Sequence, residues 1–166
     1  MDIRHRAALA RDAFAIRGGR IDLGRFLENL VRFSITLDVL PDSGGSLPPN
    51  VEACWIPESL TLCLRESVYR DACHNDPRAL FTVFHEMGHF ALGHRRTLNR
   101  ERPGVEIKTY EDSEWQANQF AAEFLMPLDE IRRRRYQTES ELMSVFGVSR
   151  EAARIRLERL RKSGEI

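Results

Sequence analysis

The chain has 166 residues, of which 42% are hydrophobic and 30% are charged, a composition typical of a folded globular protein. No apolar run approaches the ~18 residues that a membrane span needs, and the first residues lack the apolar core of a signal peptide. The three cysteines, Cys54, Cys63 and Cys73, form no Cys-x-x-Cys pair, which is typical of reduced thiols. These features exclude a secreted disulfide scaffold and predict a cytoplasmic protein with no membrane partner.

Charge is unevenly distributed along the chain. Lys plus Arg and Asp plus Glu each number 25, so the formal net charge is zero. Residues 131–162 nevertheless contain ten basic and four acidic side chains, and the rest of the chain balances this excess. The sequence therefore predicts a basic surface near the C-terminus.

The first third of the chain predicts two helices followed by strands. Residues 1–17 are helical in composition and end at a Gly-Gly pair, and Asp22 is suited to cap a second helix. Strands are expected at 35–40, 51–56 and 59–65, with a turn cluster between the first two.

The strand at 59–65 has the clearest pattern. Leucines at positions 60, 62 and 64 fall on one face of a strand, and the residues between them fall on the other. This alternation predicts a sheet that is packed on one side only. We further expect an edge strand here, to which an extended peptide can pair.

The remainder of the chain predicts helices at 76–93, 113–126, 138–146 and 149–162. Each begins at a capping signal: an Asp-Pro pair, two capping boxes that start at Ser113 and Thr138, and a serine. No internal repeat or low-complexity segment is present.

The third helix carries the motif His-Glu-x-x-His, from His85 to His89. Positions i and i+4 share one face of a helix, so both imidazoles can reach one metal ion. Glu86 lies beside them, where it can accept a proton from metal-bound water without being a ligand. The alternative is a pair of hydrogen-bonded core histidines, but burying these side chains without a metal leaves polar groups unpaired.

A catalytic zinc needs a third protein ligand and one open position. Glu114 begins the next helix, and Ala117 and Ala121 on the same face would let that helix approach the metal helix closely. The spacing alone also leaves Glu111 and Asp112 open, since an acid in a first turn is favoured by the helix dipole.

The cleft needs a donor for the developing oxyanion. His94 is a poor ligand because it lies five residues beyond His89, but it can line the cleft. His94, Tyr110 and Tyr136 are the candidates, and the sequence does not choose among them.

Three segments, 85–89, 114–127 and 146–149, together resemble the ImmA/IrrE family of zinc metallopeptidases. The resemblance implies that His85, His89 and Glu114 bind one Zn²⁺ ion, with Mn²⁺ or another divalent metal possible in vitro, and that Glu86 is the general base. It also implies an α+β fold: a zincin-like domain over 1–127 with a short antiparallel or mixed sheet, and a small helix-turn-helix-like module over 128–166 packed on it.

The same resemblance implies a protein substrate. Family members commonly cut a helix-turn-helix repressor, which releases a stress, phage or mobile-element programme. We therefore expect an endopeptidase of narrow specificity. The alternative is a DNA-binding or protein-interaction regulator in which the zinc is structural.

The C-terminal module offers a second functional surface. Arg150, Arg154 and Arg161 share the outward side of the last helix, where they can contact DNA phosphates or an acidic partner. A solvated face is the alternative, and the four arginines at 132–135 are interpreted in that way. The apolar residues expected to form the core of the module are Leu142, Phe146, Val148, Ala153, Leu157 and Leu160.

Overall fold

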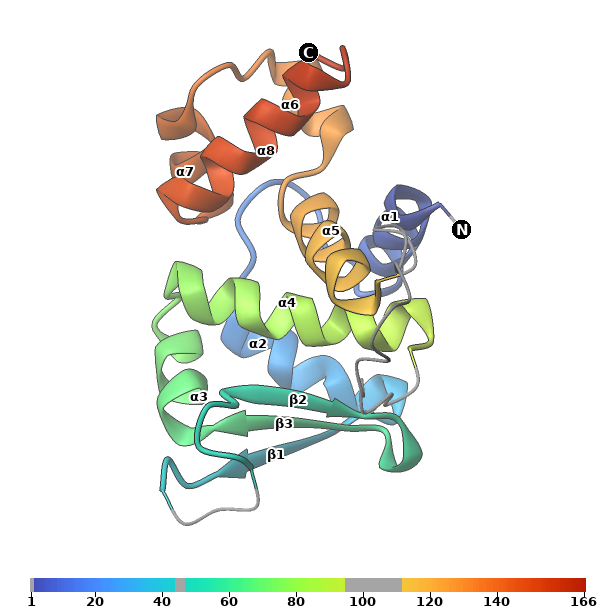
Figure 1. Ribbon diagram of the computed structural model, residues 1–166, viewed down its shortest axis with the longest axis vertical. Coiled ribbons are helices and arrows are strands. Elements are labelled where there is room, and N and C mark those ends of the chain that lie inside the picture. Colours follow the sequence, from blue (N-terminus) through green and yellow to red (C-terminus); the bar gives the residue numbers. More distant parts are fainter. Residues whose placement is uncertain (1, 44–46, 95–111) are drawn as a thin grey trace, which may run out of the picture.

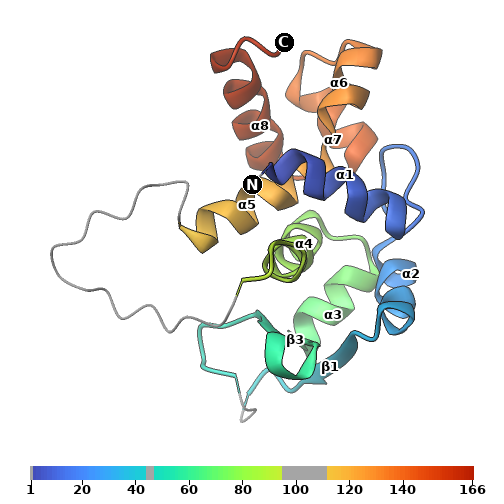
Figure 2. The same cartoon turned by 90° about the vertical axis from the view of Figure 1, so that its right-hand side faces the viewer.

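The computed structural model describes residues 2–43, 47–94 and 112–166 (Figure 1). A small sheet forms the bottom layer, helix α4 (Pro77–Leu92) crosses the middle, and the C-terminal helices form the top. Figure 2 looks along α4 and shows α1 (Ile3–Ala13) and α5 (Ser113–Leu125) above it. The other helices are α2 (Leu23–Glu28), η1 (Asn29–Phe33), η2 (Pro57–Ser59), α3 (Glu66–Cys73), α6 (Leu128–Arg134), α7 (Glu139–Phe146) and α8 (Arg150–Lys162).

No helix in the described ranges is long and apolar enough to cross a membrane.

Most helix starts lie where the sequence predicts them. The Asp22 side chain accepts a hydrogen bond from the Arg25 amide, and Thr138 forms the predicted capping box at α7. The cap of α5 differs by one residue: Asp112, not Ser113, accepts from the Glu114 amide at 2.9 Å. Aspartate is a favourable N-cap residue, and in this structure the Asp112 side chain caps α5 instead of joining the candidate ligands.

The sheet has three strands in the described part of the chain, β1 (Thr36–Leu40), β2 (Ala53–Ile56) and β3 (Thr61–Arg65), in the order β1-β3-β2. β3 pairs in parallel with β1 and antiparallel with β2, so the sheet is mixed. The prediction that 59–65 forms an edge strand is wrong, because β3 is central and both of its backbone edges are paired. β2 is an edge strand instead.

The prediction of a sheet packed on one side is also wrong. Cys63 and Arg65, on the face expected to be open, are 3% and 7% exposed. The Arg65 guanidinium satisfies its donors on backbone carbonyls, among them those of Val51 at 2.8 Å and Pro48 at 2.7 Å. The described residues between β1 and β2 therefore cover this face of the sheet, and they contact it through the buried Arg65 side chain. An alternation pattern predicts an arginine at this position to face solvent, which is why the prediction failed.

The core is continuous from the sheet and α4 to the C-terminal helices. All six apolar residues expected to form the core of the C-terminal module are buried. In addition, Arg156 of α8 and Glu123 of α5 form an ion pair at 2.6 Å in which both side chains are 2% exposed. Arg4 of α1 reaches the same carboxylate at 3.1 Å. Burial raises the pKa of Glu123, but the hydrogen bonds and charges of Arg156 and Arg4 outweigh it and lower the pKa overall.

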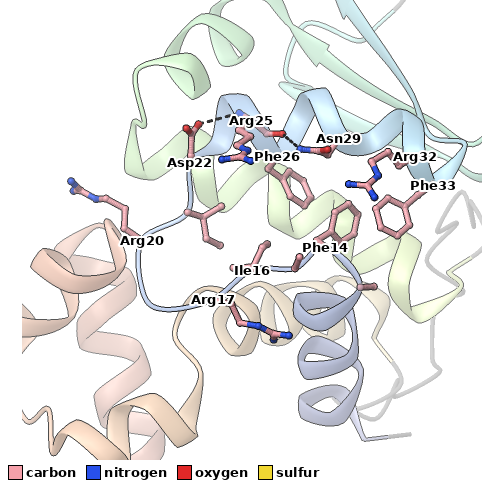
Figure 3. Close-up of a pocket in the computed structure, with 13 residues that line it drawn as sticks. Phe14, Ile16, Arg17, Arg20, Asp22, Arg25, Phe26, Asn29, Arg32 and Phe33 are labelled. Atoms are coloured by element: carbon pink, nitrogen blue, oxygen red, sulfur yellow. Dashed lines mark hydrogen bonds between the residues drawn. The ribbon is translucent and has the colours of Figure 1, made fainter.

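Aromatic side chains connect the end of α1 and helix α2 to α4. Phe14 contacts Phe26 at 4.7 Å between ring centroids, and Phe26 contacts Phe84 of α4 at the same distance. A cavity of about 410 Å³ opens beside these rings. Figure 3 shows Arg25 and Arg32 above the phenylalanines, on the helical segment that carries Phe26.

Candidate metal centre

Three potential ligands converge between α4 and α5. The Nε2 atoms of His85 and His89 are 3.2 Å apart, and the Glu114 carboxylate oxygens lie 3.2 Å from the first and 3.4 Å from the second. Ligand atoms about 2.0–2.1 Å from a tetrahedral zinc are themselves about 3.4 Å apart. The Nε2–Nε2 distance is close to this edge, and each Nε2 lies near that distance from a different oxygen of Glu114, so the three side chains could together hold one divalent metal ion.

The position of Glu114 depends on a close crossing of α4 and α5. Gly88 faces α5, and a Cβ at this position would lie 3.0 Å from both the Cα and the carbonyl oxygen of Ala117. Ala117 and Ala121 are fully buried at the crossing. The small residues therefore bring the first turn of α5, with Glu114, against the histidine face of α4, as the sequence predicts.

Hydrogen bonds to neighbouring side chains fix the orientation of the histidine rings. The Nδ1–H of His85 donates to Asn118 Oδ1 at 3.1 Å. His94 Nε2 lies 3.1 Å from Gln116 Oε1, and His94 Nδ1 lies 3.0 Å from His89 Nδ1. Because an amide oxygen only accepts, His94 donates from Nε2 and accepts from His89 Nδ1–H. Both ligand candidates thus carry their proton on Nδ1 and present an Nε2 lone pair to the centre.

Burial and the nearby charge of His85 lower the pKa of His89 to about 4. His89 is therefore neutral near pH 7, which is the state that binds a metal.

Glu86 lies beside the ligand group and outside it. Its Oε2 accepts a hydrogen bond from the Trp55 amide at 2.8 Å, which ties the carboxylate to the edge of β2. Burial raises the pKa of Glu86, against the opposing effects of His85 and of the Trp55 N–H. Oε2 is held by the backbone, and Oε1 has no hydrogen bond to another described residue, so it can take part in proton transfer.

These groups line a cleft of about 310 Å³ between β2 and the two helices. The lining residues are Val51, Ala53, Cys54, Trp55, Pro57, His85, Glu86, His89, His94, Ser113 and Glu114. The strand edge beside the candidate metal centre is therefore that of β2. An extended peptide bound in this cleft would pair with β2 and not with the strand at 59–65.

The other residues singled out in the sequence are distributed as follows. His94 lines the cleft and supports His89. Tyr136 is not brought to the site: its ring packs on Phe146, 6.1 Å between centroids, because the helical turn after α6 directs it into the C-terminal core. Tyr110 and Glu111 lie outside the described residues.

The α8 arginines singled out in the sequence, Arg150, Arg154 and Arg161, are exposed and lie away from the cleft. Arg150 lies 3.7 Å from Glu139, Arg154 pairs with Glu158 at 2.7 Å, and Arg161 donates to the Gln137 carbonyl. Sequence reasoning missed the supporting roles of Asn118 and Gln116. The only available signal was the placement of Asn118 one turn after Glu114.

A solved structure titled "Mycobacterium tuberculosis transcriptional regulator" is similar to the chain with a TM-score of 0.57 and 22% sequence identity. The similarity covers 93% of this chain and 46% of that one, so this chain spans less than half the length of that protein. No curated protein sequence matches the chain. The model of the Peptidase M78 family, described as the IrrE N-terminal-like domain, matches residues 54–158. This match covers more than half of the chain and confirms both the resemblance and the expected α+β zincin-like fold; the chain belongs to the Peptidase M78, IrrE N-terminal-like family.

Proposed function

We propose that the protein is a zinc-dependent endopeptidase of narrow specificity that cuts a regulatory protein, in the first instance a helix-turn-helix repressor. The observation that carries the proposal is the convergence of His85, His89 and Glu114 to within 4.8 Å of one another, with Glu86 beside them at the edge of β2. A zinc ion in this site supplies a Lewis acid for the substrate carbonyl and lowers the pKa of a bound water.

The side chains and backbone of the protein transfer the proton, align the substrate and orient the ligands. Glu86 accepts the proton of the attacking water on its free oxygen and passes it to the leaving amine. The β2 edge pairs with the extended substrate and aligns its carbonyl. His94 holds the His89 ring in place through Nδ1. Tyr136 is packed in the C-terminal core and His94 Nε2 is bonded to Gln116, so neither side chain is free to serve as the oxyanion donor in this arrangement.

A structural zinc in a regulator is the second candidate, and the solved structure cited above is titled a transcriptional regulator. Structural zinc sites are closed by four protein ligands. Here three side chains converge on a cleft, and the Glu114 side chain is 60% exposed. This openness favours catalysis over a structural role.

The experiment compares the zinc-loaded wild-type protein with zinc-loaded Glu86→Gln. Each is incubated with an extract of the source organism, and new peptide N-termini are identified by mass spectrometry. We expect a few cuts, concentrated in one regulator, that Glu86→Gln does not produce although it keeps its zinc. Identical N-termini in both samples would favour the structural role.

A further inference from the structure

A cavity lies between the end of α1 and the α2–η1 segment (Figure 3). Its volume is about 410 Å³, within the range of about 300–1,000 Å³ that is typical of small-molecule sites. None of the described residues that line it also lines the metal cleft. The cavity is therefore separate from the candidate metal centre and from the proposed chemistry.

Phenylalanine rings form an apolar wall of this cavity. The Phe14 ring lies 4.0 Å from the Phe33 ring and 4.7 Å from the Phe26 ring, measured between centroids. Phe26 is buried and packs in turn on Phe84 of α4, which fixes the wall to the metal helix. Phe14 and Phe33 are only half-buried, so they offer ring surface that a ligand can remove from water.

The turn that places Phe14 is held in a conformation that costs energy. Ala15 has a φ of 54°, in the left-handed region that favours glycine. Its amide donates to the Asp12 carbonyl at 3.0 Å, and the next amide, that of Ile16, donates to the Arg11 carbonyl at 2.8 Å. These two bonds form a Schellman motif, which ends α1 and brings Phe14 and Ile16 to the cavity. The wall is therefore formed before any ligand binds.

Two arginines lie above these rings. Arg25 and Arg32 are seven residues apart, which is about two helical turns, so both lie on one side of the α2–η1 segment, where they line the cavity (Figure 3). Both side chains are exposed, and neither guanidinium is bonded to a carboxylate in the described parts of the chain. Their charges are therefore available to a ligand.

The balance of charge around the cavity is positive. Its described lining residues include four arginines, at positions 17, 20, 25 and 32, and one acid, Asp22. Arg17 is neutralised by its pair with Asp12. Arg20 extends away from the rings in Figure 3, and Asp22 caps α2 by accepting from the Arg25 amide at 3.0 Å. The remaining arginines exceed the acid by two charges, and an apolar wall with a basic rim is complementary to an amphipathic anion.

We propose that this cavity binds a small aromatic anion, whose ring packs on Phe14 and Phe33 and whose acid group pairs with Arg25 and Arg32. Aromatic rings stack on exposed phenylalanine faces, and planar guanidinium groups bind the oxygens of carboxylates, sulfonates and phosphates through two donors. The proposal does not depend on the proposed function, because none of the candidate metal ligands lines the cavity.

The probes are 1-anilinonaphthalene-8-sulfonate, an aromatic anion whose fluorescence rises in an apolar site, and N-phenyl-1-naphthylamine, which has the same rings without the sulfonate. Both dyes are titrated into the zinc-loaded protein and into three variants. Arg25→Gln/Arg32→Gln removes charge from the rim, and Phe33→Leu keeps the wall apolar but removes one ring. Arg6→Gln/Arg70→Gln is the matched control, since it removes two exposed arginines outside the cavity. Thermal melts verify that each variant is folded, because such dyes also bind partly unfolded chains.

We expect the sulfonate dye to bind one site per chain and to lose about tenfold or more in affinity in Arg25→Gln/Arg32→Gln, because hydrogen bonds to charged groups are worth about that factor. The uncharged dye should bind this variant as it binds the parent, and Phe33→Leu should weaken the binding of both dyes. Equal affinity for the sulfonate dye in the two double variants overturns the proposal. An equal loss of both dyes in Arg25→Gln/Arg32→Gln also overturns it, since the arginines would then only maintain the shape of the cavity.

The titrations are repeated after the zinc has been removed with a chelator. Unchanged binding of the sulfonate dye supports the cavity as its site, whereas loss of binding would place the dye on the metal and would overturn the proposal. Cleavage by the same protein bears on the proposed function alone, so failure of the one is distinguishable from failure of the other.

Discussion

Replacing Gly88 with alanine tests the close helix crossing that positions the third ligand. The added Cβ would lie 3.0 Å from two backbone atoms of Ala117 and 3.3 Å from the Cβ of Phe120. Ordinary carbon contacts are about 3.5–4.0 Å, so α5 must move away by about 0.5–1 Å. Such overpacking costs about 1–3 kcal/mol, and the better helix propensity of alanine returns about 1 kcal/mol. Because backbone atoms cannot rotate aside, we expect the cost to fall in the upper half of this range, which leaves a net loss of about 1–2 kcal/mol in the free energy of unfolding.

The same shift separates Glu114 from the two histidines. Metal sites tolerate ligand displacements of only about 0.2 Å, so zinc affinity should fall by about tenfold or more. Urea unfolding gives the stability, and competition with a chromophoric chelator gives the affinity. Gly24→Ala is the control, since its Cβ meets only the Asp22 carboxylate at 3.6 Å. If Gly88→Ala binds zinc as tightly as Gly24→Ala does, the crossing does not determine the site.

Three further predictions concern the supporting network, the buried ion pair and the basic surface. His94→Ala should still bind one zinc per chain but about 10–100-fold more weakly, as read by chelator competition, because it removes the hydrogen bond that orients His89. Glu123→Gln should destabilise the protein by about 3–5 kcal/mol near neutral pH, since it leaves Arg156 buried without a counter-charge. The lowered pKa of Glu123 means that its contribution is complete above about pH 4.3 and is lost as the pH falls through the folded-state value, so urea unfolding of Glu123→Gln should lack that acid-dependent loss. Replacing Arg150, Arg154 and Arg161 of α8 by alanine should raise KM for the partner more than it lowers kcat and should remove the salt dependence of cleavage; an unchanged KM and salt profile would make this surface a structural cap.

The sequence predicts the elements whose residues repeat at a fixed spacing. The caps at Asp22 and Thr138 and the apolar positions of α7 and α8 are local features, and they lie where the pattern predicts them. Helix α3 was missed because only Val68 and Ala72 of its eight residues are buried, and Arg65 at its N-cap makes no side-chain capping bond.

The order of the strands in the sheet depends on contacts between segments that are distant in the sequence, so a local pattern does not predict it. Alternation at 59–65 identifies a strand, but nothing in it says which strands lie on either side, and β3 proved to be central. The buried Arg65 and Arg156 were missed for a related reason, because each is stabilised by partners that are distant in the sequence.

Helix geometry alone predicts the two candidate histidine ligands, whereas it left Glu111 and Asp112 open beside Glu114, which the family resemblance selected. The i, i+4 spacing places His85 and His89 on one face, and the alanines of α5 mark the face that carries Glu114. The orienting partners Asn118 and Gln116 depend on ring orientations and on where two helices cross, which no spacing pattern contains.

We propose that His85, His89 and Glu114 together bind one zinc ion, and that Glu86 is not a ligand. Zinc per chain, measured by elemental analysis after reconstitution and dialysis, tests it directly. We predict about one zinc in the wild-type protein and in Glu86→Gln, and less than about 0.1 in His85→Ala, His89→Ala and Glu114→Ala, because a site with two protein ligands is too weak to survive dialysis. The helices should persist in all of them, as seen by far-UV circular dichroism, since their apolar faces pack without the ion. Full zinc occupancy in Glu114→Ala, or loss of zinc in Glu86→Gln, would contradict the assignment.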